Sequence, residues 1–381
     1  MKILSKITLF LGIIIIAVLI VASLIEKLYF QVNGHFATRY VYTSLWFILL
    51  WTIFALCCIR LYFDNVKSKN FYTTLLHSAL VIILLGAITT FFTSTKGYFE
   101  LSNHESTTYY IQDDNSLVAD LPFTFTYDSL KITSDDIGSS VCMKNGYNII
   151  LTGRYDFAEF AVIYDPFGFA ITGLGYCILF VACIVLIIKS FRGIRHSLNF
   201  KSIICEANTK SQTHKFSSFS FAFIICAIAF IYLMYNNVIV GERFIYGKPL
   251  TVALLFIHVS LVTIAYILFL VLLLMSIPSI IDKKRATLQM YDTQYKILTI
   301  ALLFLLMGIF SGATWANFSW GSYWQWDPKE TWALITLLTY CIPLHYHLKP
   351  REQSIFLVCA FVCVLFTFIG VNYLLGGLHS Y

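Results

Sequence analysis

Residues 7–25 read ITLFLGIIIIAVLIVASLI, a run without a charged side chain. A helix of about 20 apolar residues spans the hydrocarbon core of a bilayer. The positive start at Lys2 and Lys6 also fits a signal peptide, but the run is longer than a usual signal core and no Ala-x-Ala site closes it. We therefore predict an uncleaved membrane anchor.

Similar runs recur along the chain, of which 59% is hydrophobic and only 12% charged. This composition lies far outside the soluble globular range. The sequence therefore predicts an all-α polytopic membrane protein with about nine transmembrane helices. The expected spans are residues 7–25, 41–61, 72–92, 167–188, 216–235, 251–275, 297–314, 331–346 and 354–375.

Lysine and arginine collect in alternate loops, as expected when cytoplasmic loops retain positive charge. If the N-terminus is cytoplasmic, residues 93–166, the loop before residue 331 and the C-terminus lie outside. The net charge of +6 then reflects topology, and no basic stripe indicates nucleic acid. The predicted inner loops hold Arg60, Lys67, Lys69, Lys189, Arg192, Arg195, Lys201, Lys210, Lys215, Lys283, Lys284, Arg285, Lys296, Lys349 and Arg351.

The stretch 93–166 is polar and strand-like. Residues 121–127 alternate, and residues 147–152 are rich in β-formers. We predict a small β-containing extracytoplasmic domain here. The ten cysteines include no Cys-x-x-Cys pair, and Cys142 is the lone cysteine of this stretch, so a disulfide scaffold within the chain is not expected.

Five of the seven tryptophans lie in one segment, Trp315-Ala-Asn-Phe-Ser-Trp-Gly-Ser-Tyr-Trp-Gln-Trp-Asp-Pro-Lys-Glu-Thr-Trp332. Tryptophan gathers at membrane interfaces, so an aromatic belt is one interpretation. The density of flat rings favours a site for a large planar ligand. Asp327, Pro328 and Glu330 also have the spacing of a helix start, as N-cap, N1 and N3.

Four histidines lie in or beside predicted spans, where ionisable residues usually face a cavity, a cofactor or one another. Counting about 1.5 Å per residue, His77 and His345 lie toward the inner half, about 8 Å and 21 Å into their spans. His258 lies about 10 Å into a span entered from outside, and His379 follows the last span. Two imidazoles commonly hold haem iron from opposite sides, so the sequence offers two bis-histidine sites. For His35, His104, His196, His214 and His347 we predict surface positions.

The tryptophan segment closely resembles the "WWD" signature of haem-handling proteins, in the form found in the CcsA (ResC) family. The first four spans, with His77 and the motif Leu121-Pro-Phe-x-x-x-x-Asp128, look like an abbreviated CcsB (ResB) protein. The whole chain thus resembles the fused CcsBA cytochrome c synthase, with a shorter outer domain. The division would be 1–92 as CcsB-like helices, 93–166 as the outer domain, 167–215 as the fourth helix with a basic loop, and 216–381 as the CcsA-like part with the WWD segment 315–332.

The resemblance implies that the substrate is haem b in its Fe²⁺ form, attached by thioether bonds to the Cys-x-x-Cys-His motif of an apocytochrome c outside a bacterial cytoplasmic membrane. His77 with His345, and His258 with His379, match the family's paired haem ligands, and the outer pair would be catalytic. Gly376 and Gly377 would let His379 reach back over the platform. A separate thiol reductant is implied. Haem contacts are expected from Trp315, Trp320, Trp324, Trp326, Asp327 and Trp332, with Lys329 as a candidate propionate partner.

Two other functions fit the same residues. A haem exporter or chaperone would keep the haem sites and deliver haem to a separate lyase. A b-type electron-transfer protein would hold redox-active haem at both sites and never release it. The two CcsB-like and CcsA-like parts in one chain favour the synthase.

Overall fold

The computed structural model is mostly helical, with one small sheet. It describes residues 2–29, 36–65, 71–113, 117–128, 132, 140–144, 146–154, 157–165, 167–198, 248–282, 286–320 and 323–375. The helices are α1 (Lys2–Tyr29), α2 (Leu45–Asn65), α3 (Phe71–Thr93), α4 (Gly168–Leu198), α6 (Lys248–Ile281), α7 (Leu288–Trp320), α8 (Pro328–His345) and α9 (Pro350–Leu365), with π-helical turns η1 (Thr38–Tyr42) and η7 (Phe366–Leu375).

Seven of the described helices are long and apolar enough to cross a membrane. They are α1, α2, α3, α4, α6, α7 and the continuous helix formed by α9 and η7. The prediction of a polytopic membrane protein is confirmed. The short span expected at 331–346 corresponds to α8, which is not among the seven, and the span expected at 216–235 lies outside the described residues.

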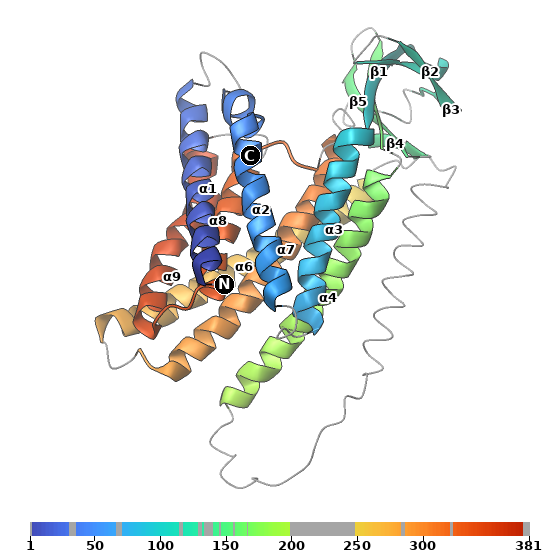
Figure 1. Cartoon of the computed structure of the whole chain (residues 1–381). Helices are drawn as coiled ribbons and strands as arrows, with labels where there is room; N and C mark the ends of the chain where they lie inside the picture. Colours follow the sequence, from blue (N-terminus) through green and yellow to red (C-terminus); the bar gives the residue numbers. More distant parts are fainter. Residues whose placement is uncertain are drawn as a thin grey trace.

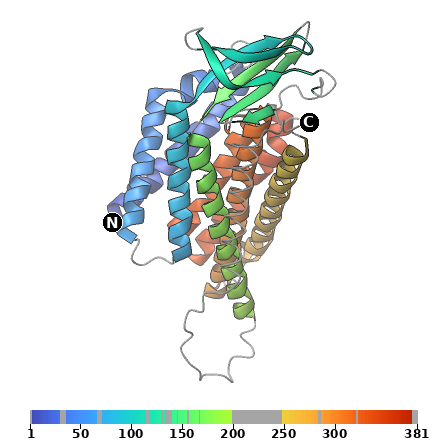
Figure 2. The same ribbon diagram turned by 90° about the vertical axis from the view of Figure 1, so that its right-hand side faces the viewer.

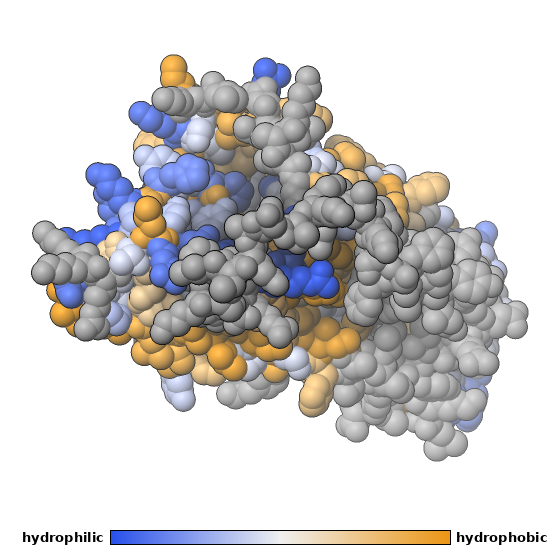
Figure 3. Space-filling view, turned by 90° about the horizontal axis from the view of Figure 1, so that it is seen from below, coloured by the Kyte–Doolittle hydropathy of each residue, from blue (hydrophilic) through white to orange (hydrophobic). Residues whose placement is uncertain are grey.

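Helices α1, α3, α7 and α9 run toward one end of the bundle, and α2, α4, α6 and α8 run toward the other (Figure 1). The sheet, the loop before α8 and the end of η7 lie at one end, and Figure 2 shows the same arrangement from the side. We call this the sheet end. The other end, where α2, α4, α6 and α8 finish, is called the basic end; it carries Arg60, Lys189, Arg192, Lys296, Lys349 and Arg351. Seen from that end, hydrophobic side chains line the flank (Figure 3).

Glycines bring α3 and α4 into close contact. A Cβ on Gly86 would lie 2.7 Å from the backbone nitrogen of Thr172, and one on Gly175 would lie 3.0 Å from that of Ile83. Helices in lipid gain little from the hydrophobic effect between them, so small residues and hydrogen bonds hold them together. This close packing sets the position of α3, which carries His77, against α4.

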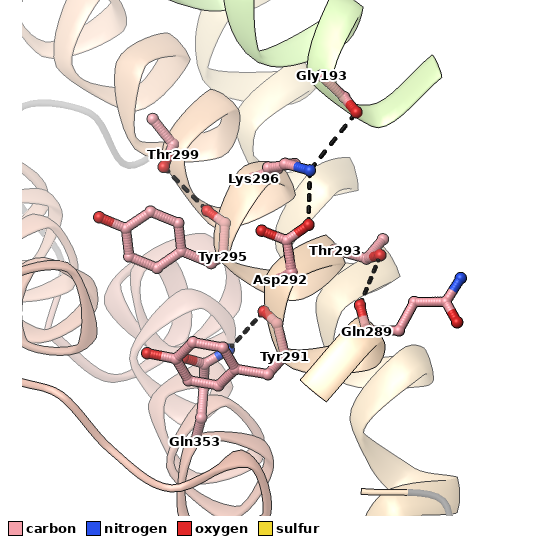
Figure 4. Close-up of polar contacts among 9 residues, drawn as sticks. All are labelled: Gly193, Gln289, Tyr291, Asp292, Thr293, Tyr295, Lys296, Thr299 and Gln353. Carbon is pink, nitrogen blue, oxygen red and sulfur yellow. Dashed lines mark hydrogen bonds and ion pairs between the residues drawn. The ribbon is translucent and has the colours of Figure 1, made fainter. Parts of the chain in front are cut away.

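Polar contacts tie the helices together at the basic end (Figure 4). The buried Gln353 of α9 donates to the carbonyl oxygen of Tyr291 (3.4 Å) and to the side-chain oxygen of Gln294 (3.3 Å), both on α7. Lys296 of α7 pairs with Asp292 and donates to the carbonyl oxygen of Gly193 on α4 (3.5 Å). These bonds join α4, α7 and α9 where the expected inner loops begin.

The sheet is six-stranded and antiparallel, in the order β3-β2-β1-β6-β5-β4. Its central strands β1 and β6 continue α3 and α4, and they pair from Thr95 with Tyr164 to Leu101 with Ala158. The small β region and the strands predicted at 121–127 and 147–152 are confirmed. The strands are β1 (Thr95–Leu101), β2 (Ser106–Gln112), β3 (Val118–Thr126), β4 (Ser140–Lys144), β5 (Tyr147–Arg154) and β6 (Ala158–Tyr164).

Candidate functional site

The structure brings His77 of α3 and His345 of α8 together, although 268 positions separate them in the sequence. Each ring is oriented by its own helix. Nδ1 of His77 lies 2.7 Å from the carbonyl oxygen of Thr73, and Nδ1 of His345 lies 3.0 Å from that of Cys341. A carbonyl oxygen only accepts hydrogen bonds, so each Nδ1 carries the proton and the lone pair of each ring is on Nε2.

The two rings have the separation of a shared metal site. Their centroids are 6.4 Å apart and their planes meet at 80°. A ring nitrogen lies about 1 Å from its centroid and binds a metal at about 2 Å, so two imidazoles on opposite sides of one ion have centroids about 6 Å apart. Tyr62 of α2 stacks on His77 at 5.5 Å, and its hydroxyl contacts Ser78 and the carbonyl oxygen of Thr74. The centroid separation of His77 and His345 therefore matches that of two imidazoles on one ion.

His258 of α6 is oriented by a neighbouring helix instead. Its Nδ1 lies 2.8 Å from the carbonyl oxygen of Gly308 on α7, which again leaves the lone pair on Nε2. The ring lies against the α7 backbone, since a Cβ on Gly312 would be 2.6 Å from Nδ1 and 2.7 Å from Cε1. The expected partner of His258, His379, lies outside the described residues, as do Gly376 and Gly377.

The predicted helix start is confirmed at α8. Asp327 is the N-cap and accepts from the backbone N–H of Lys329 (3.0 Å). Glu330 completes the capping box by accepting from the N–H groups of Asp327 (3.2 Å) and Gln325 (2.9 Å). The Asp327 side chain is buried, so its observed role is to hold the loop of residues 323–327 against α8.

Trp326 occupies the centre of that loop. Its backbone has a φ of 59°, a left-handed conformation that bulky residues rarely adopt. Its ring stacks on Tyr42 of η1, with centroids 4.4 Å apart and planes 15° apart, and meets the edge of Phe47 on α2. Trp324 stands perpendicular to Trp326, with centroids 5.9 Å apart.

The other tryptophans differ in their surroundings. Trp332 is 6% exposed, its ring lies over Phe366 at 3.9 Å, and its N–H donates to Ser23 of α1 (3.0 Å). The role of Trp332 in haem binding stays a prediction. Trp315 is partly buried on α7, one turn beyond Gly312. The side chain of Trp320 lies outside the described residues.

Comparison with known proteins places these residues in a family. The sequence profile described as "Cytochrome C assembly protein" matches residues 184–379, more than half of the chain. This chain belongs to the cytochrome c assembly protein family.

Individual relatives match a shorter stretch. The chain is similar to proteins named cytochrome c biogenesis protein CcsA: 40% identical over 153 residues to that of Chlamydomonas reinhardtii (35% of this chain, 43% of the relative) and 47% over 97 residues to that of Synechococcus sp. strain CC9605 (24% and 32%). The relative from Trachelium caeruleum is 46% identical over 91 residues (23% and 29%). The chain therefore spans less than half the length of these relatives.

The matched cytochrome c assembly segment contains His258, the tryptophan segment and His345. It does not contain His77, nor Ser23 and Tyr42, which hold Trp332 and Trp326. The matched segment and the part of the chain before it are therefore in contact both at the His77–His345 pair and at the tryptophan segment. Sequence reasoning missed Ser23 and Tyr42, because a serine in an apolar helix and a tyrosine at a helix start carry no signal of a distant partner.

Lys329 was the expected contact of a propionate. In the structure its ammonium group donates to the side-chain oxygen of Asn372 on η7 (3.1 Å), which ties the start of α8 to the last helix. Burial lowers the pKa of Lys329, and the nearby Asp327 carboxylate partly opposes this. The propionate contact of Lys329 stays a prediction.

The sheet also covers the end of α7, which the sequence did not predict. The side-chain nitrogen of Asn148 on β5 donates to the carbonyl oxygen of Asn317 (3.3 Å). Tyr323, in the loop before α8, lies against Tyr176 of α4, and its burial raises its pKa well above the usual value. The β region is therefore positioned directly beside the tryptophan segment.

Proposed function

We propose that this protein is a membrane cytochrome c synthase of the fused CcsBA type, which attaches haem to apocytochrome c. The observation that carries the proposal is the adjacent pair His77 and His345, with 6.4 Å between ring centroids and both Nδ1 atoms bonded to backbone. One ligand comes from the CcsB-like helices and the other from the matched family segment. The pair thus supports a fused arrangement in which both parts build one site.

The proposed orientation has the basic end in the cytoplasm and the sheet end outside. The basic side chains at the basic end support it, since cytoplasmic ends retain positive charge; they are Arg60, Lys189, Arg192, Lys296, Lys349 and Arg351. His77 and His345 then bind incoming haem toward the cytoplasmic side. His258 lies on the other side of the bundle midpoint, in the part of α6 nearer the sheet end. His379 would complete the outer pair with it.

At the outer site the side chains act by positioning. His258 holds iron through Nε2, and Trp324 and Trp315 limit the tilt of the porphyrin plane. Haem, the substrate, supplies two vinyl groups: each cysteine thiol of Cys-x-x-Cys-His adds across one vinyl bond, so that a C–S bond forms and the thiol proton ends on the other vinyl carbon. The addition is redox-neutral, and a separate reductant keeps the two thiols available. The histidine of the substrate then replaces one axial ligand before release.

The test is co-expression with an apocytochrome c in a host that lacks its own haem lyase. Thioether-bound haem is measured by the pyridine haemochrome spectrum and by haem staining on denaturing gels. We expect product with the wild type, none with His258→Ala or His77→Ala, and wild-type yield with the control His347→Ala, which removes an exposed histidine close to His345. Bound haem without thioether product in the wild type would instead indicate a haem exporter.

A further inference from the structure

Tyr42 lies in the N-terminal part of the chain, outside the matched family segment, yet it is in contact with the centre of the tryptophan segment. Its side chain is buried at 6% exposure. The ring is parallel to that of Trp326, and Phe47 packs against both rings, at 5.9 Å from each. A stacked ring of this kind fixes both the position and the plane of its partner.

A hydrogen bond from α8 contacts the backbone of the same residue. The Thr331 hydroxyl, on the first turn of α8, donates to the carbonyl oxygen of Trp326 (3.4 Å). The Tyr42 hydroxyl lies beside the Thr331 side chain. Tyr42 therefore contacts Trp326 through its ring and adjoins the side chain that bonds the Trp326 main chain.

The conformation held in this way is strained. With φ at 59°, Trp326 is one of two non-glycine residues with positive φ among the described residues, the other being His104. Such a conformation persists only where the surroundings enforce it, and it is common at ligand clamps. Trp324 follows the orientation of Trp326, because the two rings pack at right angles two residues apart.

We propose that Tyr42 is a positioning residue for the outer site: it holds Trp326 in its left-handed conformation and so sets the plane that Trp324 presents to haem. The proposal rests on the proposed function for its ligand. Its structural part, the dependence of Trp324 on Tyr42, does not require haem. It also assigns the first helices a task beyond supplying His77, since Tyr42 of η1 and Phe47 of α2 contact the tryptophan loop.

The test compares Tyr42→Leu, which removes the ring, with Tyr42→Phe, which keeps the ring and loses the hydroxyl. Phe269→Leu is the matched control, because Phe269 is fully buried and stacked on Tyr340 in a separate cluster. In haem-free protein, the emission and acrylamide quenching of Trp324 are obtained by difference from the same variant carrying Trp324→Phe. Haem at the outer site is then measured in a His77→Ala background, where the inner pair is absent.

Tyr42→Leu is expected to shift the Trp324 emission to the red, to increase its quenching and to abolish the outer haem signal. Tyr42→Phe is expected to restore most of that signal, and Phe269→Leu to leave both readouts unchanged. Unchanged emission and haem in Tyr42→Leu would overturn the proposal. If Tyr42→Leu does not fold, Thr331→Val removes the hydrogen bond to the Trp326 carbonyl and the polar neighbour of the Tyr42 hydroxyl. Wild-type emission and haem in Thr331→Val and in Tyr42→Phe would overturn the role of these polar contacts. A third outcome separates the two proposals: the Trp324 emission shifts to the red in Tyr42→Leu, but the His77→Ala protein that keeps Tyr42 binds no outer haem. That result would support the positioning role of Tyr42 and contradict the proposed function.

Discussion

The inner pair of histidines and the outer His258 use the same hydrogen bond in different ways. His77 and His345 each bond to the carbonyl four residues earlier in their own helix. His258 bonds across to Gly308 of α7 and packs on Gly312. The inner rings therefore keep their tautomer and direction as long as each helix exists, while the outer ring depends on the contact between α6 and α7.

This difference shows where each site is vulnerable. The inner site depends on the relative height of α3 and α8, because two locally oriented rings must still face each other. The proposed outer site depends on the packing of His258 against Gly312 and on the loop of residues 323–327, which contacts Tyr42 and α8. Mutations of residues other than the histidines should therefore impair haem binding at one site and leave the other intact.

Gly312→Ala should have the largest effect. The new Cβ would lie 2.6 Å from Nδ1 of His258, and a side chain yields more easily than helix backbone, so the ring moves and the fold remains. A displacement of about 1 Å at a reacting centre lowers the rate by about 100-fold. Holocytochrome yield should fall by that factor with the inner haem retained. The control is Gly173→Ala, where a Cβ meets no atom within 4 Å; equal loss in both variants would contradict the role of Gly312.

Gly86→Ala should damage the inner site. Its Cβ would lie 2.7 Å from the backbone nitrogen of Thr172, so α3 has to move against α4. Overpacking of this kind costs about 1–3 kcal/mol, and the shift displaces His77 from His345. Thermal unfolding in detergent and the haem content of a His258→Ala background measure the two consequences. Normal haem content in the Gly86→Ala, His258→Ala double variant would show that the α3–α4 contact does not position His77.

Ser23→Ala should lower stability moderately without removing either pair. It leaves the buried N–H of Trp332 without its acceptor, which costs about 1–3 kcal/mol. Ser260→Ala is the comparison, since that exposed hydroxyl bonds only within its own helix. Unfolding temperatures of the two variants give the difference, and equal values would mean that the α1–α8 contact contributes little.

Asn372→Ala should have the smallest effect, about 0.5–1.5 kcal/mol or less, because its hydrogen bond with Lys329 is exposed. Lys329→Met separates two roles of the same lysine. If Lys329 only ties α8 to η7, both variants should lose stability equally and retain outer haem. If Lys329 also pairs with a propionate, Lys329→Met alone should lower the retention of haem at the outer site.

Much of the fold and part of the candidate site could be predicted from local sequence patterns. Long apolar runs gave the membrane spans, and the Asp-Pro-x-Glu spacing gave the start of α8. Helix depth alone placed His77 and His345 toward the inner half, and in the structure their ring centroids are 6.4 Å apart. What could not be predicted depends on pairings between distant segments: Tyr42 with Trp326, Ser23 with Trp332, and Gly312 with His258. The π-helical turns were also missed, because no residue pattern distinguishes them from α-helix in an apolar run.

The central claim is that two separate histidine sites bind haem, and the reduced visible spectrum of the detergent-purified protein tests it most directly. The comparison uses the wild type, His77→Ala, His258→Ala and the double variant, each supplied with haem. We predict low-spin b-type bands in the wild type, partial loss in each single variant with recovery on adding imidazole, and complete loss in the double variant. A double variant with the full wild-type spectrum would contradict the account, since haem would then bind elsewhere.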